Sequence, residues 1–325
     1  MSKGKSGYMT ALLLDGKGGA RELSDAEVDS WTPTDGLLWV DVDQSSKRGR
    51  EWLTQKSKLS ANARSALLAG ETRPHSLVDV DGLIVIMRGI NMNPGSVPDD
   101  MVAIRLFMNE HRIVTSLRRK VLSVVDVREA LLAGNGPKSL GGFLVMLTGC
   151  LAGRIEAAVD NIEQILEGLD SDIAGGDIST IRSELSTARR QAAAIRRHLA
   201  PQRDALDRLA RASSDLLTDK ERFSLADEGN HLTRYIEDLD LARENALVTQ
   251  EELMNRVAME QNSRMYLLSV IAAIFLPLTF VTGMLGMNVA GLPGTSNPNG
   301  FVFSSIVMVA LGIGLVMYFR WRKWI

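Results

Sequence analysis

The stretch that decides the fold lies near the carboxyl end, where residues 266–285 read YLLSVIAAIFLPLTFVTGML without a single charge. A second uncharged stretch, residues 301–319, follows after the turn-rich loop 286–300. Each stretch is long enough to cross a hydrocarbon core about 30 Å thick as a helix. Two spans return the chain to the side from which it started, so both termini are expected on one side of a membrane.

Basic residues flank the two apolar stretches and predict their orientation. Arg256 and Arg264 precede the first stretch, and Arg320, Arg322 and Lys323 follow the second. Positive charge next to spans gathers on the cytoplasmic side, so both termini are predicted to be cytoplasmic and the loop extracellular or periplasmic. The first 15 residues lack the apolar core of a signal peptide, which fits this orientation. A hydrophobic hairpin buried in a soluble protein is the alternative.

One face of the first span differs from the rest of it. Its members recur every three or four residues and therefore share one side of a helix: Asn262, Met265, Leu268, Ala272, Leu276, Thr279 and Gly283. We call this set the stripe. If several copies packed it around an axis, the stripe would line a pore with apolar rings that gate by dewetting. A helix–helix seam has the same periodicity. Pro277 is predicted to bend the helix or free a carbonyl group.

The first third of the chain has mixed α and β character. Residues 37–42 predict a strand, and residues 76–88 predict a hairpin around Asp81-Gly82. Residues 101–108 and 112–117 predict a second strand pair, and residues 47–68 have helical composition. The short connections favour one compact α/β domain that ends near residue 135.

Helical patterns dominate after Gly136-Pro137. We predict helices over residues 139–173, 178–199 and 202–217, with a break at Pro201. From about Ser224 no proline occurs until Pro277, and residues 232–285 alone would form a rod of roughly 80 Å. The predicted order is a cytoplasmic α/β domain (1–135), a cytoplasmic helical region (136–225), a long stalk helix (226–264), a pore-lining transmembrane helix (265–285), the loop (286–300), a second transmembrane helix (301–319) and a basic cytoplasmic tail (320–325).

Composition excludes several classes of protein. The 37 basic and 39 acidic residues leave no basic excess, so nucleic acid is not an expected partner. Cys150 is the only cysteine, which rules out an intramolecular disulfide and a multi-cysteine zinc site. The four histidines are scattered, and there is no phosphate loop, nucleophile elbow or clustered acid–base pair. We therefore predict neither an enzyme nor a bound cofactor.

The end of the first span carries a specific resemblance. Residues 274–280 (IFLPLTF) and Gly283 lead into Gly286-Met287-Asn288, and the second span ends in Tyr318-Phe319 before Lys323-Trp324-Ile325. This arrangement resembles the signature of the CorA superfamily of divalent metal ion transporters. The resemblance implies a homopentamer in the lipid bilayer of the bacterial inner (plasma) membrane. Its fold would be an α+β cytoplasmic domain, with a mixed sheet and flanking helices, then a very long stalk helix and two transmembrane helices.

The same resemblance implies roles for individual residues. Gly286, Met287 and Asn288 would form the outer selectivity filter. Thr279 would add a polar ring, Asn262 another at the cytoplasmic end, and Met265, Leu268 and Leu276 would be constrictions. A ring of amide oxygens can recognise a divalent cation through its water shell, without the cost of removing that shell.

The choice of ion depends on the loop. Residues 289–294 carry no acidic residue and are closer to ZntB-like zinc transporters than to magnesium channels, so Zn²⁺ transport is favoured. A Mg²⁺ channel that also admits Co²⁺ or Ni²⁺ is the alternative, and a non-conducting scaffold or sensor is an alternative of another class. Residues 266–319 contain no His, Cys, Asp or Glu, which favours passage of a hydrated ion and passive, gated conduction. Glu251 and Asp227 are the nearest candidates for a regulatory metal site, with a solvated or intersubunit salt-bridge role as the default.

Overall fold

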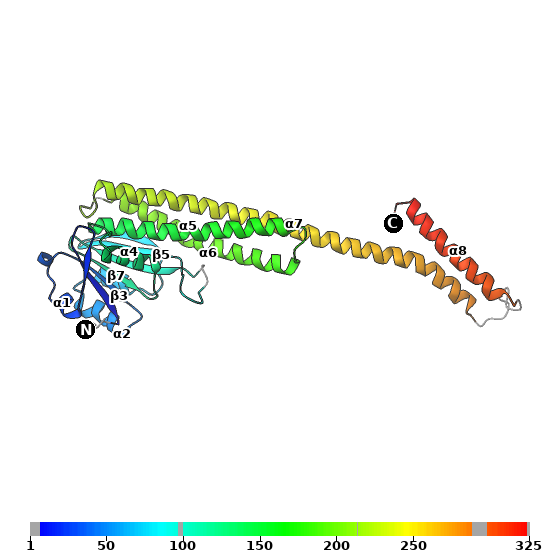
Figure 1. Cartoon of the computed structure of the whole chain (residues 1–325), viewed down its shortest axis with the longest axis horizontal. Helices are drawn as coiled ribbons and strands as arrows, with labels where there is room; N and C mark the ends of the chain where they lie inside the picture. The colour runs from blue at the N-terminus through cyan, green and yellow to red at the C-terminus, as the bar shows by residue number, and fades with distance from the viewer. Residues whose placement is uncertain (1–6, 97–99, 213, 288–297, 324–325) are drawn as a thin grey trace. The chain divides into compact units, whose positions relative to one another are not determined.

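The computed structural model describes residues 7–96, 100–212, 214–287 and 298–323. The chain divides into two compact units, Met1–Gln250 and Glu251–Ile325. The first unit consists of a β-sheet and the helices that pack on it (Figure 1). The second unit holds the last part of helix α7 (Asp219–Leu285) and helix α8 (Gly300–Trp321).

The described strands of the first unit form one mixed sheet in the order β2-β1-β3-β7-β6-β5-β4. Strands β3 and β7 run parallel, and the other neighbouring pairs are antiparallel. The hairpin β4–β5, with its turn at Asp81-Gly82, and the pair β6–β7 confirm the sequence predictions, as does β3. The strands are β1 (Met9–Leu14), β2 (Ala20–Leu23), β3 (Leu37–Asp43), β4 (His75–Asp79), β5 (Gly82–Gly89), β6 (Val102–Met108) and β7 (Arg112–Leu117).

Strands β1 and β2 were not predicted. Strand β2 has only four residues, Ala20-Arg21-Glu22-Leu23, and forms an edge of the sheet. Its two central side chains are exposed, so it has no apolar run that would reveal it. Its position depends on backbone pairing with β1, which a sequence pattern does not contain.

Helices cover both faces of the sheet. Because side chains alternate along a strand, Val40 packs with Trp52 and Leu67 on one face, and Trp39 meets Phe143 on the other with ring centroids 4.7 Å apart. The first face is covered by α2 (Lys47–Glu51), the π-helical η2 (Trp52–Lys56) and α3 (Ala61–Leu68). The second face is covered by α4 (Leu122–Leu132), α5 (Leu140–Asp172) and α6 (Ile178–Arg211). Two short helices, α1 (Asp25–Ser30) and η1 (Pro33–Asp35), lie between β2 and β3 in the chain.

Helix α6 corrects two predictions: it continues through Pro201 rather than ending at Leu199, and it ends at Arg211 rather than near Leu217. Proline removes one hydrogen bond inside a helix, yet packing continues on both sides of it. Leu199 and Leu206 are both buried. The Gln202 side chain also accepts a hydrogen bond of 2.7 Å from the backbone N–H of Arg88 in β5. These contacts with the sheet keep the second half of α6 helical.

Helix α5 has the composition of a membrane span but belongs to the first unit. It is one of three described helices that are long and apolar enough to cross a membrane, the others being α7 and α8. Much of its most apolar part is buried inside the unit, whereas none of the corresponding part of α7 or α8 is. Tertiary packing therefore accounts for the apolar character of α5.

Helix α7 is the long helix that the sequence predicted, with 67 residues. It begins after Thr218, where the Glu221 carboxylate accepts a 2.9 Å bond from the Thr218 N–H and the Thr218 hydroxyl accepts one of 3.3 Å from the Glu221 N–H. This reciprocal pair is a capping box. Within the first unit, Arg196 of α6 donates to both carboxylate oxygens of Asp240 of α7, at 2.5 and 2.9 Å.

A polar chain crosses the otherwise apolar face beneath α5. The buried Trp39 Nε1–H donates to the Thr115 hydroxyl (3.1 Å), and that hydroxyl donates to Asp41 Oδ1 (2.6 Å). Burial is the main influence on Asp41 and raises its pKa to about 6. The hydrogen bond from Thr115 and the charge of Arg128 act in the opposite direction. Asp41 is thus a carboxylate that folding makes harder to ionise.

Replacing Asp41 with Asn is expected to stabilise the protein at neutral pH. The pKa of Asp41 rises on folding from 3.8 to about 6, so Asp41 costs no stability below pH 4 and its full penalty is present above pH 6. At pH 7, Asp41→Asn should gain up to about 3 kcal/mol, measured as a higher thermal unfolding midpoint, and the gain should vanish near pH 4. Asp79→Asn is the matched control, because hydrogen bonds from Asn62 and Ser60 lower the pKa of Asp79 and predict a lower midpoint at pH 7. A gain for Asp41→Asn that did not depend on pH would contradict this explanation.

Candidate ion pathway on helices α7 and α8

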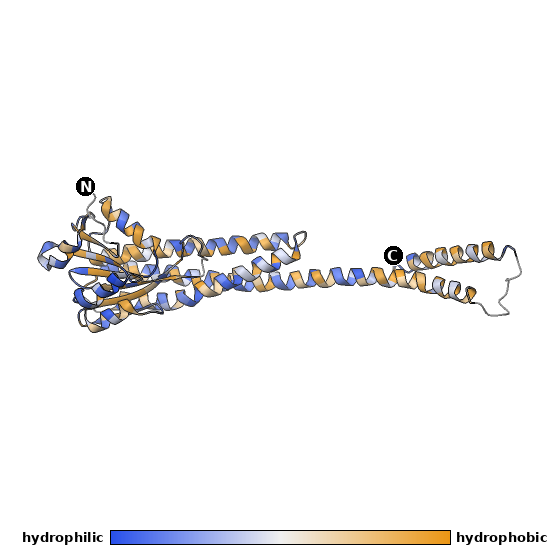
Figure 2. Ribbon diagram, turned by 90° about the horizontal axis from the view of Figure 1, so that it is seen from below, coloured by the Kyte–Doolittle hydropathy of each residue, from blue (hydrophilic) through white to orange (hydrophobic). Residues whose placement is uncertain are grey.

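Helix α8 packs against one side of the last part of α7. The two helices run alongside each other in both views of the second unit (Figures 1 and 2), and a Cβ atom at Gly312 of α8 would lie 3.9 Å from Leu278 of α7. On α7 between residues 270 and 281, the buried and partly buried residues are Val270, Ala273, Ile274, Pro277, Leu278 and Val281. On α8 they are Gly300, Ser304, Ser305, Met308, Gly312, Leu315 and Phe319. Each set recurs every three or four residues and so forms one helix face.

The stripe predicted from the sequence lies on the opposite side of α7. Leu276 is two residues from both Ile274 and Leu278, which places it about 160° around the helix from each. All seven stripe residues are exposed. Met265, Leu268 and Leu276 are 66%, 65% and 71% exposed, against 9% for Val270. The stripe is therefore not the seam between α7 and α8, and it remains open to other surfaces.

Polar groups on this side of α7 are of two kinds. The hydroxyl of Ser269 donates to the carbonyl of Met265, and that of Thr282 donates to the carbonyl of Thr279, both at 2.9 Å. These two hydroxyls are bonded within the helix. The Thr279 hydroxyl has no hydrogen-bond partner among the described residues, so it can interact with a molecule on the stripe side.

Pro277 lies inside α7, on the side that faces α8, and the helix continues across it. Having no N–H, it cannot donate to the carbonyl of Ala273 one turn earlier. The predicted bend or freed carbonyl at this position stays a prediction. Gly283, a little further along the stripe, presents open space, since a Cβ atom there would meet nothing within 4 Å.

The predicted filter lies at the end of α7. The N–H of Gly286 donates to the carbonyl of Thr282 at 2.9 Å, and Met287 is the next described residue. Asn288, the residue predicted to provide the amide ring, and the following loop to residue 297 lie outside the described residues. The roles of all three filter residues therefore stay predictions.

The candidate regulatory residues Asp227 and Glu251 are both exposed on α7. Among the described residues, no group of three or more His, Cys, Asp or Glu side chains could hold a metal ion. A regulatory metal at Asp227 or Glu251 would thus need ligands from beyond the described part of this chain.

The α/β unit, the 67-residue helix and the second apolar helix, with Gly-Met-Asn between the two helices in the sequence, together with the family and relatives that follow, define a membrane protein that transports divalent metal cations. The chain belongs to the CorA-like Mg²⁺ transporter protein family, whose model matches residues 34–322. The match covers the sheet from β3 onward and both apolar helices.

Individual relatives extend over almost the whole chain. The divalent cation transporter CmaX of Pseudomonas aeruginosa is 34% identical over 319 residues, covering 97% of this chain and 94% of CmaX. The zinc transport protein ZntB of Pectobacterium carotovorum is 30% identical over 320 residues, covering 98% and 97%. ZntB of an Enterobacter species is 33% identical over 316 residues, covering 97% and 95%.

Solved structures confirm the fold. The full-length CmaX structure matches with a TM-score of 0.83 and 32% identity over 100% of both chains. The CorA magnesium transporter of Methanocaldococcus jannaschii also has a TM-score of 0.83, over 99% of this chain and 100% of that one. Its identity is only 18%, so this second likeness concerns the fold alone.

The two faces of α7 predict different behaviour for single cysteines in a Cys150→Ala background. Leu276→Cys, on the open stripe, is expected to form disulfide-linked dimers of the chain under mild oxidation in membranes. Leu278→Cys, packed against α8, should stay monomeric on a denaturing gel. Equal cross-linking at both positions, or cross-linking at residue 278 alone, would contradict the assignment of the faces.

Proposed function

We propose that this chain assembles as a homopentamer in the bacterial inner membrane and transports Zn²⁺, with both termini in the cytoplasm. The observation that carries this proposal is the stripe, which α8 leaves open along one side of α7. Copies of α7 arranged around an axis would bring their stripes together. The proposed pore is lined by Asn262, Met265, Leu268, Ala272, Leu276, Thr279 and Gly283.

The filter would select the ion at the outer end of this pore. Asn288 from each copy supplies an amide oxygen, and the backbones of Gly286 and Met287 complete the ring. Amide oxygens bind the water shell of a small divalent cation well. The hydroxyl of Thr279, which has no hydrogen-bond partner among the residues that the structure describes, would contact the same water shell further in. The apolar rings at Met265, Leu268 and Leu276 would close the pore by excluding water.

The choice of Zn²⁺ rests on two observations. Relatives named as zinc transport proteins are 30–33% identical to this chain over nearly its full length, and the loop after the filter carries no acidic residue. Mg²⁺ is the second candidate, because the family is described by Mg²⁺ transport and a filter that reads a water shell would also accept Mg²⁺. Co²⁺ and Ni²⁺ fall in the same class. The metal is cargo, and we propose no bound cofactor and no catalytic activity.

The proposed transport is passive. Proton-coupled carriers place titratable groups along the pathway, and residues 266–319 contain no His, Cys, Asp or Glu. Dehydrated Zn²⁺ would require such ligands, so the ion would cross with most of its water. The membrane potential would then supply the driving force for uptake.

Flux into proteoliposomes tests the proposal. Wild-type protein should carry Zn²⁺, and Mg²⁺ less well, with the same rate whether or not a pH gradient is present. Asn288→Ala should reduce Zn²⁺ flux about tenfold or more, as expected for loss of a hydrogen bond to a charged species. Asn297→Ala, the same change in the same loop, should leave the flux near that of the wild type.

Three results would contradict parts of this proposal. Mg²⁺ flux without Zn²⁺ flux would make the protein a magnesium channel. Zn²⁺ flux that disappears with the pH gradient would replace passive conduction with proton coupling. Equal losses in Asn288→Ala and Asn297→Ala would remove the filter role of Asn288.

A further inference from the structure

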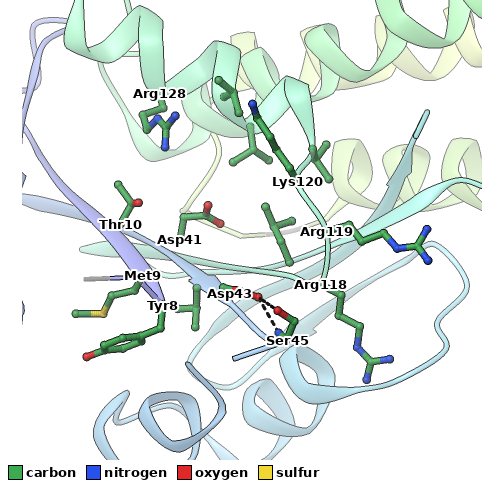
Figure 3. A pocket seen from close by; sticks show the side chains of 16 residues that line it. Tyr8, Met9, Thr10, Asp41, Asp43, Ser45, Arg118, Arg119, Lys120 and Arg128 are labelled. Carbon is green, nitrogen blue, oxygen red and sulfur yellow. Dashed lines mark hydrogen bonds between the residues drawn. The ribbon is translucent and has the colours of Figure 1, made fainter. Parts of the chain in front are cut away.

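A second site lies in the first unit, outside the ion pathway. A pocket of about 320 Å³ is formed where the parallel strands β3 and β7 end, between the start of β1 and helix α4 (Figure 3). Sites for small molecules commonly occupy such a position at the carboxyl ends of strands, and this volume lies at the lower end of their usual range. Asp41, near the end of β3, lines this pocket.

Some of the charged side chains around the pocket already have hydrogen-bond or ion-pair partners within the protein. Arg119 pairs with Asp100, and Arg118 donates to Gln44 at 3.1 Å. Figure 3 shows both arginines pointing away from Asp41. Asp43 accepts bonds of 2.8 and 2.6 Å from the backbone and hydroxyl of Ser45. These groups are already satisfied by the protein.

Lys120 and Arg128 are not paired in this way. Neither side chain forms a hydrogen bond or an ion pair within the described part of the chain, although the charge of Arg128 acts on Asp41 and lowers its pKa. Figure 3 places both on the α4 side of the pocket, across from Asp41 and Thr10 on the strand side. Helix α4 starts at Leu122, next to Lys120, and its cap residue Val121 makes no side-chain hydrogen bond to the helix, whereas Arg128 lies nearly two turns further along α4. Lys120 next to the helix start and Arg128 further along the same side of α4 together give this side of the pocket two positive charges, which favour a doubly charged anion.

On the opposite side of the pocket, the hydrogen bonds around Asp41 determine which of its oxygens can still accept a hydrogen bond. Trp39 Nε1–H can only donate, so the Thr115 oxygen accepts that bond and the Thr115 proton goes to Asp41 Oδ1. The second carboxylate oxygen of Asp41 is therefore left to accept a hydrogen bond from the pocket. At neutral pH this oxygen can accept a hydrogen bond from a donor such as a hydroxyl group.

We propose that this pocket binds a small phosphate monoester that carries hydroxyl groups, with its phosphate on Lys120 and Arg128 and a hydroxyl group on Asp41. Sugar phosphates and nucleoside monophosphates share this chemistry. A divalent cation fits poorly, because Lys120 and Arg128 line the pocket without a partner of their own among the described residues and Asp43 is occupied by Ser45. The site would give the transporter a cytoplasmic ligand distinct from its cargo.

Isothermal titration calorimetry on the detergent-solubilised full-length protein tests the site. Ribose 5-phosphate and adenosine 5′-monophosphate are the two probes, with ribose, inorganic phosphate and Mg²⁺ as comparison ligands. At least one phosphate monoester should bind more tightly than inorganic phosphate, and ribose should not bind measurably. The monoester that binds more tightly identifies the source class.

Matched variants assign the contacts. Lys120→Ala and Arg128→Ala should each weaken binding of the phosphate monoester about tenfold, the value expected for a charge-assisted hydrogen bond. Arg119→Ala removes the same charge from the same rim and should change affinity less than about threefold, as for a screened surface charge. Asp41→Asn should reduce the affinity for the monoester to that for inorganic phosphate. Circular dichroism checks that each variant is folded.

The proposal is overturned if neither monoester binds to folded wild-type protein. It is also overturned if Mg²⁺ alone occupies the pocket, or if Arg119→Ala weakens binding as much as Lys120→Ala and Arg128→Ala do. These measurements use binding and not flux, so their outcome is independent of the transport experiment.

Discussion

One helix with two unlike faces is the constraint on which the second unit depends. Beyond Glu251, α7 buries Val270, Ile274 and Leu278 toward α8 and leaves the stripe on its other side open. Lipid would suit Leu268 or Leu276, but Asn262 and Thr279 on the same face favour a surface that offers water or hydrogen-bond partners. Identical copies packed around a wet axis would satisfy both kinds of side chain, which is why we propose that this face lines a pore rather than contacts lipid.

The same constraint bears on how an ion could be recognised. Between residues 266 and 319 the side chains offer hydroxyls and amides but no imidazole, thiolate or carboxylate. Such groups bind the water around a cation more readily than the bare cation. Selectivity would then depend on the size and charge of the hydrated ion, which accounts for a family whose members are named for different divalent metals.

Much of the fold could be predicted because local patterns and tertiary structure agree. The structure confirms the hairpin around Asp81-Gly82, the buried strand β3 and the uninterrupted helix α7. Strand β2 and the passage of α6 through Pro201 could not be predicted, because each depends on pairing or packing with a distant segment. The apolar composition of α5 likewise fits both a membrane span and a buried helix, and only its packing in the first unit distinguishes the two.

The two candidate sites also differ in how far they could be predicted from the sequence. The stripe was predictable because a helical period shows which residues share a face. The pocket was not, because it depends on the register that places Thr115 opposite Asp41, in line with Trp39 two residues earlier. Lys120 and Arg128 are unremarkable in the sequence and become informative only when their neighbours prove to be already paired.

The central claim is that identical copies close the open face of α7 around an axis. Native mass spectrometry of the protein released from detergent tests it most directly. The account predicts a complex of five times the 35.5 kDa chain, and Asn262→Leu with Thr279→Val should preserve that mass while reducing ion flux. A protein that carries Zn²⁺ or Mg²⁺ as a single chain or a dimer would contradict the account.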